Sequence, residues 1–126
     1  MAKILIVDDD VELVESTTAL LEANGHRAIS APDGTAGFEK ARAEKPELIL
    51  LDVMMATDRE GFEIAKKLKA DEATSRIPVI LVTGIRKAKH LPFRFEPDED
   101  WLPVKAVLEK PVKPEALFKA VAEILK

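Results

Sequence analysis

The sequence predicts an α/β fold in which helices cover both faces of a doubly wound, five-stranded parallel sheet. Short apolar runs rich in Ile, Leu and Val mostly lack the polar alternation of half-solvated strands, which is typical of strands buried on both faces. Longer stretches with apolar residues at helical spacing separate these runs, and such alternation indicates right-handed crossovers between parallel strands. The predicted strands are residues 4–7, 28–31, 48–51, 79–82 and 106–108.

Four helices are expected around these strands. Asp10 can cap the first helix, and the Asn24-Gly25 pair suits its left-handed end. Pro114 suits the first turn of the last helix, whose apolar residues recur on one face. The other predicted ranges are residues 33–44, ended by Pro46, residues 61–71, and residues 114–125 for the last helix.

One segment interrupts the alternation. Pro92, Pro97 and Pro103 stand between the fourth and fifth strands, and no helix of ordinary length survives prolines at that spacing. We therefore expect the region of a fourth helix to be irregular. Trp101 in this segment is expected to fill core space, or to form a docking surface with its apolar neighbours.

Composition indicates a single globular domain over residues 1–126, because 47% of the residues are hydrophobic and 33% are charged. A net charge of −4 argues against direct nucleic-acid binding or broad attraction to anionic lipid. No cysteine is available for a thiolate metal site. The four apolar residues before Asp8 are too few for a signal-peptide core or a membrane span, so we expect a cytoplasmic location.

Polar residues follow four of the five predicted strands. Residues 8–10 are all Asp after the first strand, Asp52 follows the third, Thr83 the fourth and Lys110 the fifth. Each of them alone is more often a helix cap or solvated surface. Because the carboxyl ends of parallel strands meet at one edge of the sheet, polar residues at four of these ends predict a shared site.

Clustered carboxylates repel one another unless a cation lies among them. Oxygen ligands without nearby His or Cys select a hard ion, and a few carboxylates with room for water suit Mg²⁺ better than Ca²⁺. A magnesium ion beside a carboxylate, a hydroxyl and an ammonium group is typical of phosphoryl transfer. A carboxylate would then be the nucleophile.

These segments resemble the receiver domains of two-component response regulators, over essentially the whole chain. The resemblance implies a flavodoxin-like sheet with strand order 2-1-3-4-5. The matching segments are residues 3–10 for the acidic pair, 48–54 for the acceptor strand, 82–84 for the switch motif and 110–111 for the end of the fifth strand.

By this resemblance, Asp52 accepts a phosphoryl group from a sensor histidine kinase or a phosphotransfer protein. Lys110 and Thr83 then hold the phosphoryl oxygens. The implied Mg²⁺ ligands are Asp8, Asp9, Asp52 and the backbone carbonyl of Met54. Output would pass through contact with an unknown downstream protein, and the chain would not be a turnover enzyme although it catalyses its own phosphorylation.

The chain departs from the family pattern at several positions. Val107 stands where an aromatic switch residue is usual, so the inward swing of a ring cannot operate unchanged. The segment from residue 84 to 105 is longer than usual. Met54 and Ile85, which flank the route of an attacking water in receivers, are apolar, and this predicts slow self-dephosphorylation.

Two alternatives remain open at this point. A haloacid-dehalogenase-like phosphatase would use Asp8 as its nucleophile with Asp10 at a suitable separation, although Glu12 does not match that family. A receiver-like binding module that is no longer phosphorylated is the second alternative, supported only by the altered switch positions.

Overall fold

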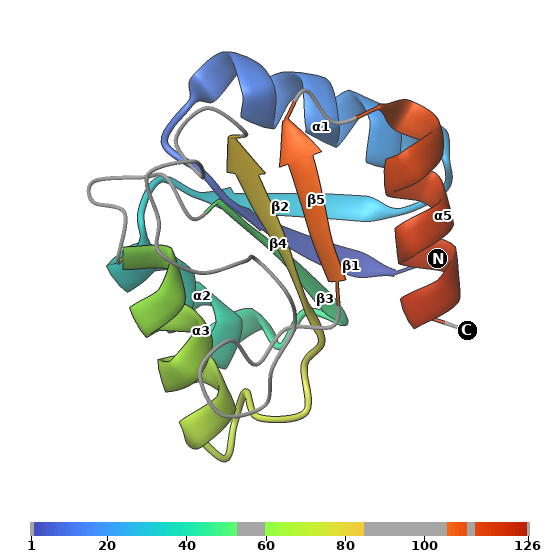
Figure 1. The fold of residues 1–126 in the computed structure, drawn as a ribbon. Helices are drawn as coiled ribbons and strands as arrows, with labels where there is room; N and C mark the ends of the chain where they lie inside the picture. Colours follow the sequence, from blue (N-terminus) through green and yellow to red (C-terminus); the bar gives the residue numbers. More distant parts are fainter. Residues whose placement is uncertain (1, 53–59, 85–105, 111–112, 126) are drawn as a thin grey trace.

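The five strands form one parallel sheet in the order β2-β1-β3-β4-β5, which confirms the predicted topology (Figure 1). The computed structural model describes residues 2–52, 60–84, 106–110 and 113–125. Its strands lie where the apolar runs predict them, each one or two residues longer, and the last two extend through Gly84 and Lys110. The strands are β1 Lys3–Val7, β2 Arg27–Ala31, β3 Leu48–Asp52, β4 Val79–Gly84 and β5 Ala106–Lys110.

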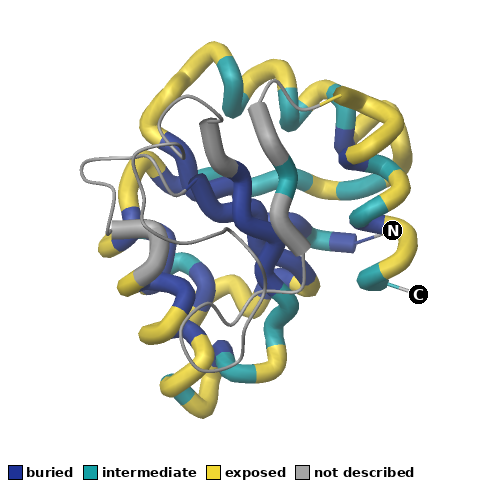
Figure 2. The backbone as a smooth tube through the Cα atoms, in the orientation of Figure 1, coloured by how far each residue is buried: buried dark blue, intermediate teal, exposed yellow. Residues whose placement is uncertain are grey.

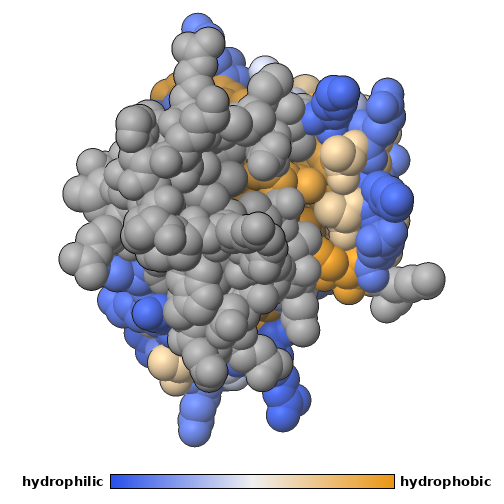
Figure 3. Space-filling model, in the orientation of Figure 1, coloured by the Kyte–Doolittle hydropathy of each residue, from blue (hydrophilic) through white to orange (hydrophobic). Residues whose placement is uncertain are grey.

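Helices cover both faces of the sheet. Helices α1 and α5 pack on one face, and α2 and α3 pack on the other (Figure 1). In the space-filling view, hydrophobic residues line the side of α5 that faces the sheet (Figure 3). The helices are α1 Val11–Ala23, α2 Gly34–Glu44, α3 Glu60–Ala70 and α5 Pro114–Ile124. The segment predicted to be irregular and Trp101 within it lie outside the described residues.

The predicted helix ends are confirmed by their capping contacts. Asp10 accepts a hydrogen bond from the backbone N–H of Leu13 (3.2 Å), which fixes the start of α1. Gly25 has a φ of +87° just after α1, a left-handed conformation that glycine adopts without steric cost. Lys45, directly before Pro46, ends α2 with a φ of +48°.

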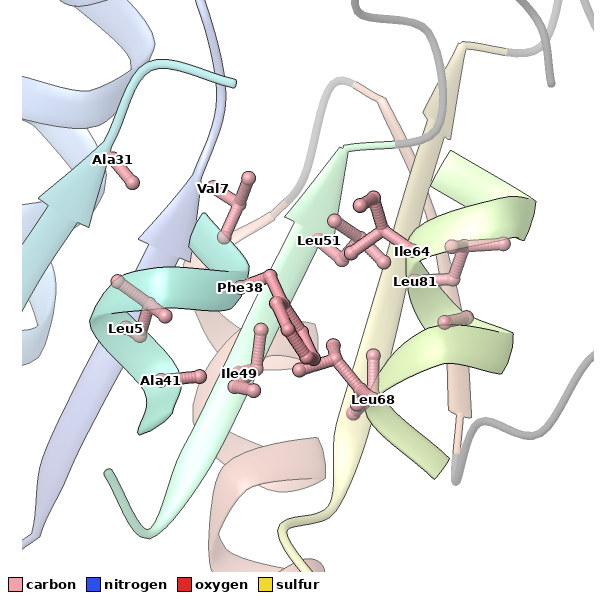
Figure 4. Close-up of a cluster of buried hydrophobic side chains, with 12 residues drawn as sticks. Leu5, Val7, Ala31, Phe38, Ala41, Ile49, Leu51, Ile64, Leu68 and Leu81 are labelled. Atoms are coloured by element: carbon pink, nitrogen blue, oxygen red, sulfur yellow. The ribbon is translucent and has the colours of Figure 1, made fainter. Parts of the chain in front are cut away.

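The core consists of two apolar layers separated by the sheet, and the central strands between them are coloured as buried in Figure 2. All five residues of β3 are buried, and their side chains alternate between the layers. Ile49 and Leu51 pack towards α2 and α3, where Figure 4 shows Ile49 beside Phe38 and Leu51 beside Ile64. Leu48 and Leu50 pack on the other side, with residues of α1 and α5. Because β3 is buried on both of its faces, all of its residues before Asp52 are apolar.

Helix α2 approaches the sheet closely at Gly37. A Cβ atom built there would lie 2.8 Å from Cγ2 of Val7, a buried side chain of β1. Real Cβ atoms essentially never come so close to another heavy atom. The missing side chain is therefore what allows α2 to pack beside β1, the strand that leads into Asp8.

We expect Gly37→Ala to lower the free energy of unfolding by about 1–3 kcal/mol, the usual cost of overpacking a core, despite the better helix propensity of alanine. Urea denaturation measures this change. The double variant Gly37→Ala/Val7→Ala should lose less stability than the sum of the two single variants, because the second change removes the clashing methyl groups. Simple additivity would contradict the packing explanation.

No helix in the described ranges combines the length and the apolar character that crossing a lipid bilayer requires.

Candidate functional site

Three of the predicted site residues meet at the carboxyl edge of the sheet. Asp8, Asp9 and Asp52 each offer one carboxylate oxygen, and these atoms all lie within 4.8 Å of one another. The sheet register explains the meeting, because Val7 of β1 pairs with Leu51 of β3 and the next residue of each chain segment carries a carboxylate. The predicted gathering of Asp8, Asp9 and Asp52 is therefore found in the structure.

The three carboxylates differ in their exposure to solvent. Asp8 and Asp52 are only 6% and 3% exposed, whereas Asp9 is on the surface. Removing a carboxylate from water is unfavourable unless hydrogen bonds or charges compensate. The cluster thus combines two fixed, buried groups with one group that remains open to water and to small solutes.

The local chain path orients Asp8. Its backbone N–H continues the β1–β2 ladder by donating to the carbonyl oxygen of Ala31 (3.1 Å). Its Oδ1 atom accepts a hydrogen bond from the backbone N–H of Asp10 (2.9 Å), an Asx-type turn. This turn is not among the features predicted above, although an Asp at a strand end that leads directly into a helix is a signal for it. The turn holds the carboxylate of Asp8 in place.

Asp10 has a separate role. Its carboxylate caps the first turn of α1 and is not one of the three clustered groups. Asp52 from β3 stands in the cluster instead. A site built from Asp8 and Asp10, as the phosphatase alternative requires, is therefore not the arrangement found among the described residues.

Thr83 and Lys110 are placed at the same edge by their strands. Asp52 pairs with Val82 of β4, so Thr83 follows the partner of Asp52 by one residue. Lys110 ends β5 and pairs with Gly84. The backbone thus brings both residues to the end of the sheet at which the carboxylates gather. Met54 lies outside the described residues, as do the side chains of Thr83 and Lys110.

The carboxylate cluster fits a magnesium ion. Mg²⁺ takes oxygen ligands at about 2.1 Å in an octahedral arrangement, so two oxygens on one ion are at most about 4.2 Å apart. The three carboxylate oxygens all lie within 4.8 Å of one another, a grouping compatible with ligands of one ion. Exposed Asp9 leaves room for the water molecules that Mg²⁺ usually retains. A cation here would also offset the mutual repulsion of the carboxylates.

Comparisons with known proteins give a consistent result. Residues 4–122 match the family model described as "Response regulator receiver domain". Protein PilH of Pseudomonas aeruginosa is 38% identical over 128 residues, which cover 99% of this chain and 98% of PilH. The crystal structure of the chemotaxis protein CheY4 of Vibrio cholerae superimposes with a TM-score of 0.80 at 25% identity, covering 99% of both chains.

Longer proteins also contain a matching region. The DNA-binding dual master transcriptional regulator RpaA of Synechocystis sp. is 31% identical over 126 residues, which are all of this chain and 50% of RpaA. The chain therefore spans about half the length of that relative. The similarity concerns the shared region and not the remainder of RpaA.

Proposed function

Because the chain belongs to the response regulator receiver domain family, we propose that it is a phosphorylation-dependent switch of a two-component phosphorelay that accepts a phosphoryl group on Asp52. We further propose that residues 1–126 form one such domain. The observation that carries the proposal is the buried carboxylate of Asp52 beside those of Asp8 and Asp9 at the carboxyl edge of the sheet.

In the proposed reaction, a carboxylate oxygen of Asp52 attacks the phosphorus of a phosphohistidine. The new O–P bond forms as the P–N bond breaks, and the imidazole leaves with the electron pair of that bond. Because β3 is paired on both sides and buried on both faces, it holds the nucleophile in a fixed position. We assign Lys110 and Thr83 to the phosphoryl oxygens, since their strands end at the same edge.

Receiver domains generally bind Mg²⁺ at an acidic pocket, and we propose that the side chains of Asp8, Asp9 and Asp52 hold the ion here, together with the backbone carbonyl of Met54. The ion would supply positive charge to the phosphoryl oxygens. The three carboxylates would otherwise repel an incoming phosphoryl group, so they must be neutralised before it can approach.

Response regulator receiver domains interact with histidine kinases or phosphotransfer proteins and with downstream effectors. For this chain we propose a histidine kinase or phosphotransfer protein as the donor and an effector protein as the target. The phosphoryl group adds negative charge and acceptor oxygens at the ends of β3 and β4, and we propose that this change is passed to the segments that follow these strands, which lie outside the described residues.

Incubation with acetyl phosphate and Mg²⁺, followed by intact-mass measurement, tests the proposed function. We expect the mass to rise by one phosphoryl group, and EDTA should prevent the rise. An unchanged mass under these conditions would favour a binding module that is not phosphorylated. Steady release of inorganic phosphate from a simple phosphate ester would favour a phosphatase.

Magnesium is expected to raise the free energy of unfolding, because the ion binds the native state and not the unfolded chain. The gain grows with the logarithm of the ion concentration. At 100 times Kd the gain is about 2.7 kcal/mol. Asp9→Asn should raise the melting temperature in EDTA, since it removes one of three like charges, and should reduce the further increase caused by Mg²⁺. Thermal unfolding with and without Mg²⁺ measures both effects. Equal magnesium-dependent shifts in the two proteins would exclude Asp9 as a ligand.

Slow self-dephosphorylation stays a prediction from Met54 and Ile85, both outside the described residues. Apolar side chains at these positions cannot position the attacking water by hydrogen bonding. We expect Met54→Asn or Ile85→Glu to shorten the phosphoryl half-life, measured as loss of the phosphorylated mass after the donor is removed. A wild-type half-life as short as that of the fastest receivers would contradict the prediction.

A further inference from the structure

A small pocket of about 90 Å³, partly open to solvent, lies between α1, α5 and the sheet, beside the carboxylate site. Asp8 and Asp52 form part of its wall, and Ser16 and Thr17 of α1 also border it. Most of the remaining wall is apolar. The apolar lining includes Ile6, Leu13, Leu20, Leu50, Val82 and Leu117.

The character of this wall indicates what could occupy the cavity. A bound water needs two to four polar partners, and among the described lining residues these are confined to Asp8, Ser16, Thr17 and Asp52, so the larger, apolar part of the wall offers water none. An apolar guest seated against the apolar part of the wall would gain dispersion contacts with the atoms that line it.

We propose that this cavity is a binding site for a small apolar molecule. Its volume is below the roughly 150 Å³ of a known apolar cavity that takes benzene or xenon, so the guest should be xenon-sized or contain only a few carbon atoms. The binding itself follows from the shape and lining of the cavity and does not depend on the phosphoryl chemistry.

A second consequence rests on the proposed function. Asp8 and Asp52 belong both to the cavity wall and to the carboxylate cluster. Occupancy of one site should therefore change the affinity of the other. A guest that packs α1 against β1 and β3 restricts the motion of these carboxylates. The protein then loses less conformational freedom when Mg²⁺ binds, and this raises its affinity for the ion.

Xenon is the probe for the first part, observed by NMR of methyl-labelled protein without Mg²⁺. We expect saturable shifts in the Ile, Leu and Val methyl signals of the lining residues. Val82→Ile and Leu117→Phe, which reduce the free volume, should abolish the shifts. Val79→Ile is the matched control, because it makes the same change in the same strand on the opposite face of the sheet. Absent shifts would indicate a pocket occupied by water, and shifts that persist in both filled variants would place xenon elsewhere; either result would overturn the proposal.

The coupling is measured by magnesium titration of the same proteins. Xenon, or Val82→Ile without xenon, should tighten Mg²⁺ binding by roughly 2-fold to 5-fold, whereas Val79→Ile should leave it unchanged. Equal affinities in all cases would exclude the coupling while leaving xenon binding intact. Failure of every protein to bind Mg²⁺ would instead contradict the proposed function.

Discussion

Asp52→Asn is expected to abolish phosphoryl uptake from acetyl phosphate completely. Asparagine has nearly the shape of aspartate, but its amide oxygen is not an effective nucleophile and cannot form the acyl phosphate. The fold should be retained, because the substitution also removes one negative charge from a crowded, buried position. Intact mass reports the phosphoryl group, and circular dichroism reports the fold.

Asp33→Asn is the matched control for this variant. Asp33 caps α2 by accepting a hydrogen bond from the backbone N–H of Ala36 (2.8 Å), and asparagine caps helices equally well. We therefore expect normal phosphoryl uptake in Asp33→Asn. Uptake that survives in Asp52→Asn but is lost in Asp8→Asn would mean that Asp8 is the nucleophile, and the receiver mechanism would be wrong for this chain.

Leu51→Ala is expected to have the largest effect on stability, lowering the free energy of unfolding by about 3–5 kcal/mol. The Leu51 side chain is fully buried in the layer between the sheet and helices α2 and α3. Truncation loses the transfer free energy of the removed carbons and leaves a cavity that rigid neighbouring strands cannot close. Urea denaturation with an unchanged m-value would measure the loss directly.

Val11→Ala provides the comparison for this core substitution. Val11 is 68% exposed at the start of α1, so its truncation should change stability by less than about 0.5 kcal/mol. A loss below about 1 kcal/mol in Leu51→Ala would show that the layer around β3 repacks easily. Such a result would argue against the rigid placement of Asp52 on which the proposed chemistry depends.

Much of the fold was predictable because the strongest constraints in this chain are local. A strand buried on both faces must be apolar throughout, so residues 48–51 stand out without any alignment. Asp10 and Asp33 mark helix starts because their side chains satisfy backbone N–H groups at that position. The meeting of Asp8, Asp9 and Asp52 also followed from a general rule, since the carboxyl ends of parallel strands share one edge.

Other features depend on contacts between distant residues and left no signal in the sequence. Nothing local to Gly37 indicates that Val7 occupies the space of its absent side chain. The cavity beside the carboxylates arises from how α1, α5 and three strands fit together, which no single segment specifies. The left-handed conformation of Lys45 is likewise unexpected, because lysine is not favoured there.

The position of β3 has a practical consequence for hydrogen-exchange measurements on this protein. Its backbone pairs with β1 on one side and β4 on the other, and helices cover both of its faces. Amide protons in such a strand exchange with deuterium only when the whole domain opens. Exchange rates at Ile49 and Leu50 would therefore report the global opening free energy without denaturant, and a ligand that binds only the native state should slow both by the same factor.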